Sequence, residues 1–575
     1  MLKKILKSVG EYKKWAFLTP LVMIGEVLME ILIPLVMAKI IDEGINGNRG
    51  MTYILEMGGL MVLMACLSMG FGALGSRFGA KAGAGFAKNL RKRLFDATAD
   101  FSFRNVDKFS TASLVTRLTT DVNNVQNAFM MFIRMAARAP IMLIGALIFA
   151  VNINARLSLV FLFSIPVLGI CLALIFFRAH PRFRVMLKKY DAMNGSVQEN
   201  LTAIRVVKAF VREKDETKKF SMSAEEVRAA QLKAEKLVIL TNPLMMLVMY
   251  ATIIAVVWIG GGMVMGGTFQ IGELSSFVTY VTQILMSLMM VSMIFMMLVI
   301  SWASFTRISE VLDEKSDIVS PENPVKEVKD GSVDFEDVSF SYLGDESNCV
   351  MNHINLHIGS GETIGIIGGT GSSKSTLVQL IPRLYDATLG AVKVGGLDVR
   401  RYDLDTLRTQ VAMVLQKNVL FSGTIIDNLR WGNENATQEE VEEACRQAQA
   451  HDFIMSFPDG YQTVMGQGGV NVSGGQKQRL CIARALLKRP KIVILDDSTS
   501  AVDTATDAKI RKALREQLSG TTTIIIAQRI STVQDCDRVL VLDNGEISAF
   551  DTHENLLKNN HIYQEVNASQ QKGVA

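Results

Sequence analysis

Six long apolar stretches in the first half of the chain constrain its fold more than any other feature. They cover Trp15–Ile41, Tyr53–Phe78, Phe129–Val151, Leu157–Phe177, Leu237–Val264 and Leu274–Trp302. A helix needs about 20 apolar residues to cross a bilayer, and each stretch reaches about that length. The mean hydropathy is +0.26, yet 20% of the residues are charged, so a second, water-soluble part must follow. We predict an all-α, polytopic membrane domain over residues 1–306.

The cations between these stretches predict the orientation of the chain. The short connections on one side hold only Arg49 and Arg156, whereas the connections on the other side, about 79–127 and 179–236, are rich in Lys and Arg. By the positive-inside rule both termini are cytoplasmic. The long connections keep a helical pattern, so the six spans should continue into the cytoplasm. The basic, amphipathic segment Met1–Trp15 predicts a helix at the membrane interface.

Two carboxylates fall inside the first predicted span. Glu26 and Glu30 are one helical turn apart and therefore share a face at membrane depth, where a charge is costly unless it is paired or wetted. Two interpretations stay open. The pair contacts a cationic substrate, or it forms structural ion pairs with Lys39, Arg134 or Arg138.

Charge and cysteine content exclude some classes of protein. The net charge is +4 over 575 residues, and no basic block with interleaved aromatic residues occurs, so nucleic acid is not a predicted partner. The six cysteines are scattered without a CxxC pair, which indicates reduced packing residues, neither disulfides nor metal ligands.

The second half begins after a polar linker at 307–332 and is predicted to be an α/β domain over 333–575. An apolar strand at Thr363–Ile367 leads into a loop rich in glycine and then into an amphipathic helix, the context of a P-loop. Loop amides would hold the phosphates, Lys374 would meet the β and γ phosphates, and Ser375 would ligate magnesium. The predicted nucleotide-binding residues are Gly368, Gly369, Thr370, Gly371, Ser372, Ser373, Lys374, Ser375 and Thr376.

One residue of this loop departs from the pattern GxxxxGK[ST], which has glycine where this chain has Ser373. A side chain at a position that needs glycine's backbone freedom costs about 1 kcal/mol or more. We expect ATP to bind, with altered local geometry.

The stretch Asn471–Asp503 combines a helix start with a strand end. Ser473 is a natural N-cap, followed by two glycines and then by apolar residues at helical spacing. The apolar run Ile492–Leu495 predicts a parallel strand buried on both faces, and it ends in Asp496 and Asp497. Carboxylates in that place can hold hydrated magnesium beside a nucleotide.

These motifs, in this order, resemble the ATP-binding cassette (ABC) family. In that family SerGlyGlyGln at 473–476 is the signature, with Ser473, Gly475 and Gln476 acting on the partner's ATP. Asp496 corresponds to the Walker B aspartate, and Ser500–Asp503 to the D-loop.

The resemblance extends to other parts of the nucleotide site. It implies that Tyr342 stacks on adenine and that Gln416, the Q-loop glutamine, contacts magnesium. It also implies ATP and Mg²⁺ as cofactors, an antiparallel β subdomain, and a helical subdomain over about 418–489.

Six spans followed by one fused cassette resemble an exporter-type half-transporter. The resemblance implies ATP-driven export of a drug, lipid or peptide by a dimer, in a bacterial cell membrane. Asp107–Val115 and Ser196–Glu216 resemble the two regions whose short coupling helices touch the nucleotide-binding domain.

Two positions of this cassette depart from active members of the family. The general base, a glutamate after the Walker B aspartate, is Asp497, and the switch histidine is Gln528. The chain therefore resembles the degenerate-site subunit of heterodimeric, multidrug-type exporters. A homodimeric exporter and a regulatory or scaffold membrane protein that binds ATP without transport remain alternatives.

Overall fold

The computed structural model describes residues 1–47, 49–497, 504–517 and 520–572. They form two compact units. The first combines Met1–Ala99 with Ala112–Glu314, and the second combines Asp100–Thr111 with Lys315–Ala575.

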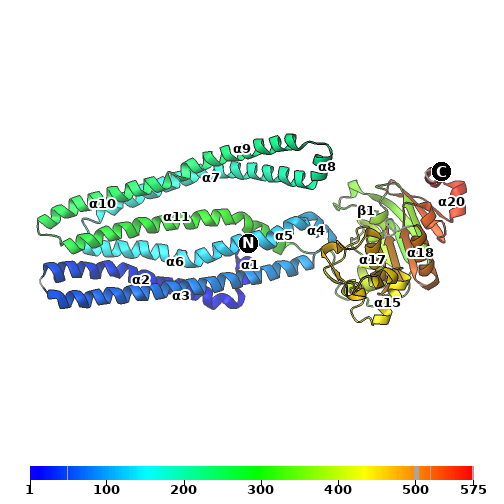
Figure 1. The fold of residues 1–575 in the computed structure, drawn as a ribbon, viewed down its shortest axis with the longest axis horizontal. Coiled ribbons are helices and arrows are strands. Elements are labelled where there is room, and N and C mark those ends of the chain that lie inside the picture. Colours follow the sequence, from blue (N-terminus) through cyan, green and yellow to red (C-terminus); the bar gives the residue numbers. More distant parts are fainter. Residues whose placement is uncertain (48, 498–503, 518–519, 573–575) are drawn as a thin grey trace. The chain divides into compact units, whose positions relative to one another are not determined.

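The first unit is made of long helices that run alongside one another (Figure 1). Six segments, some of which join consecutive helices such as α9 and α10, are long and apolar enough to span a membrane, which confirms the predicted number, and they measure between 43 and 53 residues. At 1.5 Å per residue even the shortest is about 65 Å long, twice the hydrocarbon thickness, so each segment continues beyond the bilayer. The main helices are α2 (Lys13–Lys39), α3 (Gly50–Ala99), α6 (Val122–Ile153), α7 (Leu159–Thr202), α9 (Glu213–Val238), α10 (Thr241–Met265) and α11 (Ile271–Asp313).

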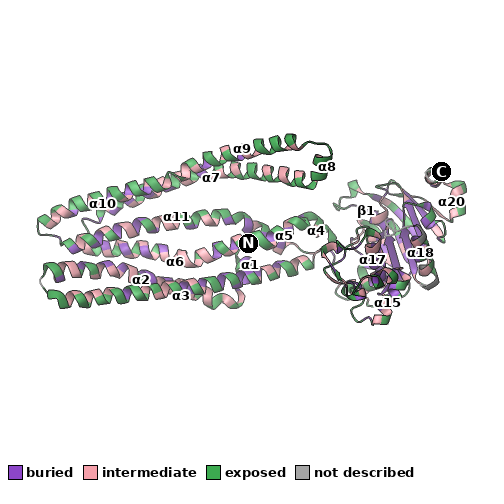
Figure 2. Cartoon of the chain, viewed as in Figure 1, coloured by how far each residue is buried: buried purple, intermediate pink, exposed green. Residues whose placement is uncertain are grey.

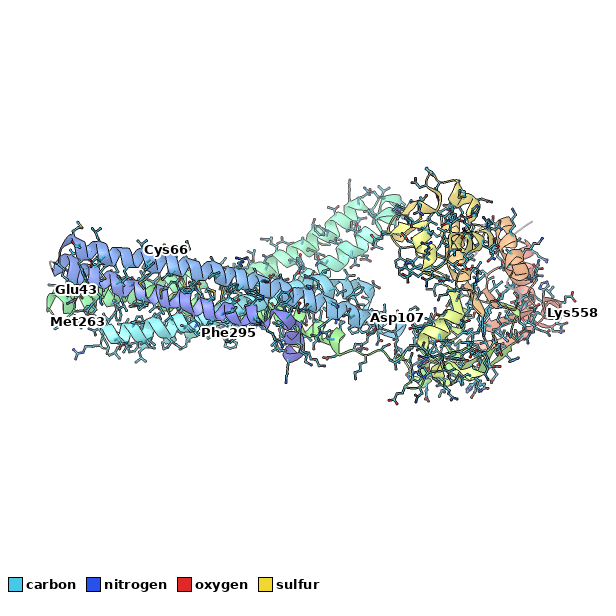
Figure 3. The ribbon with its side chains drawn as sticks, turned by 90° about the horizontal axis from the view of Figure 1, so that it is seen from below. Glu43, Cys66, Asp107, Met263, Phe295 and Lys558 are labelled. Atoms are coloured by element: carbon cyan, nitrogen blue, oxygen red, sulfur yellow. The ribbon has the colours of Figure 1, made fainter. Side chains whose placement is uncertain are left out.

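Short connections join these helices at one end of the unit. Glu43 follows α2 and Met263 lies near the end of α10, and Figure 3 shows both side chains at that end. At the N-terminus, α1 (Leu2–Leu6) is separated from α2 by a break at Gly10, whose φ of +48° favours glycine. A separate short helix therefore precedes α2, and its place at the membrane interface stays a prediction.

The first predicted coupling region, Asp107–Val115, overlaps two short helices. They are α4 (Phe103–Phe109) and α5 (Thr111–Thr116), and its coupling role stays a prediction. Ser102 starts α4 through a capping box with Asn105, and Ser110, at φ +57°, ends it. The sequence analysis did not identify the Ser102 cap, so it did not place the start of α4 at Phe103.

The second predicted coupling region contains a short helix. It is α8 (Ile204–Ala209), which lies between α7 and α9 inside the predicted range Ser196–Glu216. Ile204 and Val206 of α8 and the two following residues, Phe210 and Val211, are exposed apolar side chains.

The second unit is built on a six-stranded sheet in the order β12-β11-β3-β10-β9-β6. Five of its strands run parallel to one another, namely β11, β3, β10, β9 and β6, and β12 pairs antiparallel with β11. All residues of β9 and β10 are buried, as expected for a parallel sheet covered on both faces (Figure 2). The strands are β3 (Thr363–Gly368), β6 (Val411–Val414), β9 (Ile492–Asp496), β10 (Thr522–Ile526), β11 (Arg538–Asp543) and β12 (Glu546–Asp551).

Two smaller parts complete this unit. A four-stranded antiparallel sheet has the order β2-β1-β4-β5, and its strands are β1 (Val333–Phe340), β2 (Met351–Ile358), β4 (Leu389–Val394) and β5 (Leu397–Asp398). The helical part contains α14 (Ile425–Arg430), α15 (Gln438–Gln447), α16 (His451–Met455) and α17 (Gly474–Leu486). The predicted fold class, an all-α membrane part followed by an α/β P-loop domain with these two subdomains, is confirmed.

Candidate nucleotide-binding site

The parallel sheet places the phosphate loop and the acidic strand end at the same edge. Strand β10 lies between β3 and β9, and its residue Ile526 pairs with Ile366 of β3 and with Asp496 of β9. The loop after β3 and the carboxylates at the end of β9 therefore meet at the carboxyl edge, where α/β sheets bind ligands.

The loop holds Lys374 close to its own backbone. Its ammonium donates hydrogen bonds to the carbonyls of Gly368 at 2.8 Å and Gly369 at 2.7 Å. Burial lowers the pKa of Lys374, while the nearby carboxylates of Asp496 and Asp497 counteract that shift. The negative charge of a bound triphosphate would stabilise the protonated form of this half-buried lysine.

Backbone geometry explains why position 368 is a glycine and how Ser373, the residue that departs from the P-loop pattern, fits in this loop. A Cβ at Gly368 would lie 2.2 Å from the carbonyl oxygen of Leu542, so only glycine fits there. Ser373 has φ +69° and ψ +22°, the left-handed conformation that glycine adopts without strain. Its hydroxyl donates to the carbonyl of Val350 at 2.7 Å, which offsets part of the strain.

Ser375 and Asp496 form a pair of oxygen donors. The Ser375 hydroxyl donates to Oδ1 of Asp496 at 2.9 Å. Asp496 is buried, and this burial raises the pKa of its carboxyl, an effect that the hydrogen bond from Ser375 partly opposes. Magnesium prefers hard oxygen ligands such as a hydroxyl and a carboxylate, so this donor set fits Mg²⁺.

Asp497 and Gln528, the two residues that depart from the family pattern, contact each other. The Gln528 amide donates to Oδ2 of Asp497 at 2.8 Å. The Gln416 side chain also lies near the Asp497 carboxylate and helps to lower its pKa. Burial raises the pKa of Asp497, and both amides lower it. Two predicted site residues from separate segments, Gln416 and Gln528, thus act on the carboxylate of a third, Asp497.

Tyr342 lies beside the phosphate loop with part of its ring exposed. Its hydroxyl hydrogen-bonds to that of Thr376 at 2.8 Å. The rings of Phe340 and Tyr385 pack edge-on against it, with centroids 4.9 and 5.3 Å away. This packing orients the ring, and its 39% exposure leaves area for a base to stack on.

The signature residues lie at the start of another helix, α17. Ser473 is its N-cap and accepts a hydrogen bond from the Gln476 amide at 3.3 Å, while the Gln476 side chain accepts one from the Ser473 amide at 2.9 Å. Gly475 is the second residue of α17. The predicted D-loop, Ser500–Asp503, lies outside the described residues.

Tyr385 belongs to the surroundings of the site, and the sequence analysis missed it. Its hydroxyl donates to Oδ2 of Asp107, on α4, at 2.9 Å, and the ring of Phe103 packs edge-on at 6.0 Å. Burial raises the pKa of Tyr385, and the bond to Asp107 adds to this effect. The only sequence signal was an aromatic residue 11 positions after Lys374, which no periodicity singles out.

In the membrane unit, Glu26 and Glu30 on α2 both contact Arg138 of α6. Arg138 pairs with Oε1 of Glu26, and its other terminal nitrogen lies 2.9 Å from Oε1 of Glu30. Arg134 instead donates to the Ser76 hydroxyl at 3.1 Å. Of the three cations that the sequence offered as partners, Arg138 is the one that the described structure pairs with the glutamates.

This arrangement defines a P-loop NTPase site fused to a membrane domain. A glycine-rich loop with its lysine follows one parallel strand, an aspartate paired with the loop serine ends a neighbouring strand, and an aromatic ring flanks the loop.

Comparisons with known proteins agree in both halves of the chain. Residues 17–288 match the model of the ABC transporter transmembrane region, and residues 351–500 match that of the ABC transporter. The uncharacterised ABC transporter ATP-binding protein YfiB of Bacillus subtilis is 37% identical over 99% of this chain and 98% of its own. The mitochondrial potassium channel ATP-binding subunit of Xenopus tropicalis is 33% identical over 94% of this chain and 80% of its own.

A solved structure is similar along the whole chain. It is that of a bacterial Atm1-family ABC exporter with ATP bound, with a TM-score of 0.83 and 26% identity, covering 97% of this chain and 98% of that one. The chain belongs to the ABC transporter family. It is a multi-pass membrane protein with an exporter-type fold and an ATPase domain, and ABC exporters work as dimers in the bilayer.

Proposed function

We propose that this chain is the ATP-holding half of an asymmetric, heterodimeric exporter. The contact between Asp497 and Gln528 is the observation that carries the proposal. A general base must lie within hydrogen-bond reach of the attacking water, and about 1 Å of misplacement can cost on the order of a hundredfold in rate. Asp497 is one methylene shorter than glutamate, and an amide already occupies one of its oxygens. Gln528 cannot take the charged state of histidine, so support for the transferring phosphate weakens as well.

The same site keeps the groups needed to bind MgATP. Tyr342 would stack on adenine, Lys374 would meet the phosphates, and Ser375, Gln416 and Asp496 would hold Mg²⁺. When bound, Mg²⁺ neutralises phosphate charge. Strong binding with slow hydrolysis would keep ATP in place over many cycles and stabilise the dimer by mass action.

The signature of this chain would act at the other site. Ser473, Gly475 and Gln476 have an intact capping arrangement, and in the dimer they would face the partner's nucleotide. The partner should therefore carry a glutamate and a histidine where this chain has Asp497 and Gln528.

We also propose the finer parts of the function. The dimer would export a drug, lipid or peptide from a bacterial cell, with both termini in the cytoplasm, membrane domain 1–306, linker 307–332 and nucleotide-binding domain 333–575. The positions of the cations between spans support this orientation.

The test compares variants in the assembled transporter, measuring vanadate-sensitive ATPase activity. Asp497→Asn should leave most of the activity, whereas Ser473→Ala should remove most of it. The reverse ranking would contradict the proposal. As a gain-of-function arm, combining Asp497→Glu with Gln528→His should raise hydrolysis at this chain's own site, and no gain would argue that other departures limit it.

Two alternatives predict different results. A homodimeric exporter would give brisk ATPase activity and a dimer mass in native mass spectrometry of the chain expressed alone. A scaffold that binds ATP without transport would show no loss of activity on Ser473→Ala.

A further inference from the structure

The Glu26 cluster consists of Glu26, Glu30, Arg138 and Gln283, and it lies within the membrane unit where α2, α6 and α11 meet. Its charges do not balance. Arg138 pairs with one oxygen of Glu26 and contacts both oxygens of Glu30, at 2.9 and 3.0 Å. One guanidinium thus faces two carboxylates, and Arg134, one turn away on α6, is directed to Ser76 on α3. With both glutamates ionised, the cluster holds one negative charge more than Arg138 neutralises.

Two buried acceptors of the cluster have no hydrogen-bond donor among the described residues. They are Oε2 of Glu26, a residue only 9% exposed, and Oε1 of Gln283. The Gln283 amide nitrogen donates to the backbone carbonyl of Glu30 at 3.2 Å, which leaves its oxygen as the free atom. Unsatisfied buried polar atoms are costly in protein and more so at membrane depth.

α3 closes the cluster on its other side. A Cβ at Gly72 would lie 3.3 Å from the Glu26 carboxyl, so the glycine lets the helix backbone pass close to that group. Helices therefore enclose the orphan oxygen of Glu26 on several sides.

The geometry points to a binding site for a protonated amine. A cation restores charge balance, and an N–H group gives each orphan oxygen the donor that it lacks. A quaternary ammonium group would supply the charge but no donor, and a neutral amide would supply a donor but no charge. Both features of the cluster therefore select the same ligand, an amine that is protonated near neutral pH. The further statement that such amines are substrates of the exporter rests on the proposed function.

The test measures binding separately from transport. The probes are three dansyl compounds with one linker, ending in a primary amine, a trimethylammonium group or an acetamide. Fluorescence anisotropy with the purified, assembled transporter, without ATP, gives the affinities. The amine should bind about tenfold or more tightly than the other two, since each charge-assisted hydrogen bond contributes about that factor.

Two variants and one control assign this preference to the cluster. Glu26→Gln should abolish the preference for the amine over the acetamide, and Gln283→Leu should reduce the preference for the amine over the trimethylammonium compound. Glu56→Gln, at an exposed glutamate of α3, is the matched control and should change neither. Retained melting temperatures show that the variants fold.

Equal binding of the three probes, or an effect of Glu56→Gln as large as that of Glu26→Gln, would overturn the inference. Absence of amine binding with no change in Glu26→Gln would also overturn it. ATP-dependent uptake of a probe into inside-out vesicles tests the exporter itself, so binding without uptake would contradict export and leave the amine site standing.

Discussion

Replacing Ser473 by alanine separates the structural role of this residue from its role in catalysis. In the structure Ser473 caps α17, accepting from the Gln476 amide at 3.3 Å. Loss of such a cap costs about 1 kcal/mol of stability, with a range of about 0.5 to 2. If the hydroxyl also holds the phosphate charge of the partner's ATP in the transition state, its loss lowers turnover by about 10² to 10³.

A second capping box in the same unit provides the control. Thr437 caps α15 and accepts from the Glu440 amide at 3.3 Å, and the Glu440 side chain accepts from the Thr437 amide at 3.0 Å. Both cap residues are exposed, so Thr437→Ala should cost about the same stability as Ser473→Ala.

The assay is vanadate-sensitive ATPase activity of the assembled transporter in proteoliposomes, with melting temperature recorded for each variant. We expect similar, small shifts in melting temperature for both variants and a loss of about a hundredfold or more in turnover only for Ser473→Ala. Equal losses of turnover would show that the cap alone matters and would refute the catalytic role of Ser473.

Three further predictions concern the nucleotide site and its neighbours. Lys374→Ala should weaken binding of a fluorescent ATP analogue about tenfold or more, whereas Lys393→Ala, at an exposed ion pair with Glu336, should leave it unchanged. Burial raises the pKa of Asp496, so on acidification its carboxyl takes up a proton at a higher pH than an exposed aspartate does, and MgATP affinity should begin to fall at that higher pH. Asp496→Asn should lack this pH-dependent fall in affinity. Tyr385→Phe removes the hydrogen bond to the exposed Asp107, which should cost about 1 kcal/mol of local stability, because water replaces part of the bond. Proteolysis within 100–111 should therefore become about fivefold faster, and an unchanged rate would contradict the role of that bond.

The sequence predicted those features that depend on local patterns. Apolar length gave the six helices, and the left-handed φ of Ser373 follows from the glycine that the P-loop pattern places there. Contacts between distant segments were less accessible. The sequence offered three cations as partners of Glu26, and only the packing of the helices shows that Arg138 is the one that contacts it. No periodicity could bring Tyr385 to Asp107, because 278 residues separate them and tertiary packing alone joins them.

The second unit includes a segment that lies, in the sequence, between two helices of the membrane unit. Asp100–Thr111 belongs to it, although α3 precedes this segment and α5 (Thr111–Thr116) begins at its end. An expression clone that starts at the linker would therefore lack α4, and Tyr385 would lose its acceptor. The same holds for recombination between related genes. A cassette exchanged at the linker alone would meet a foreign α4, so compatible chimeras would need to exchange both segments together.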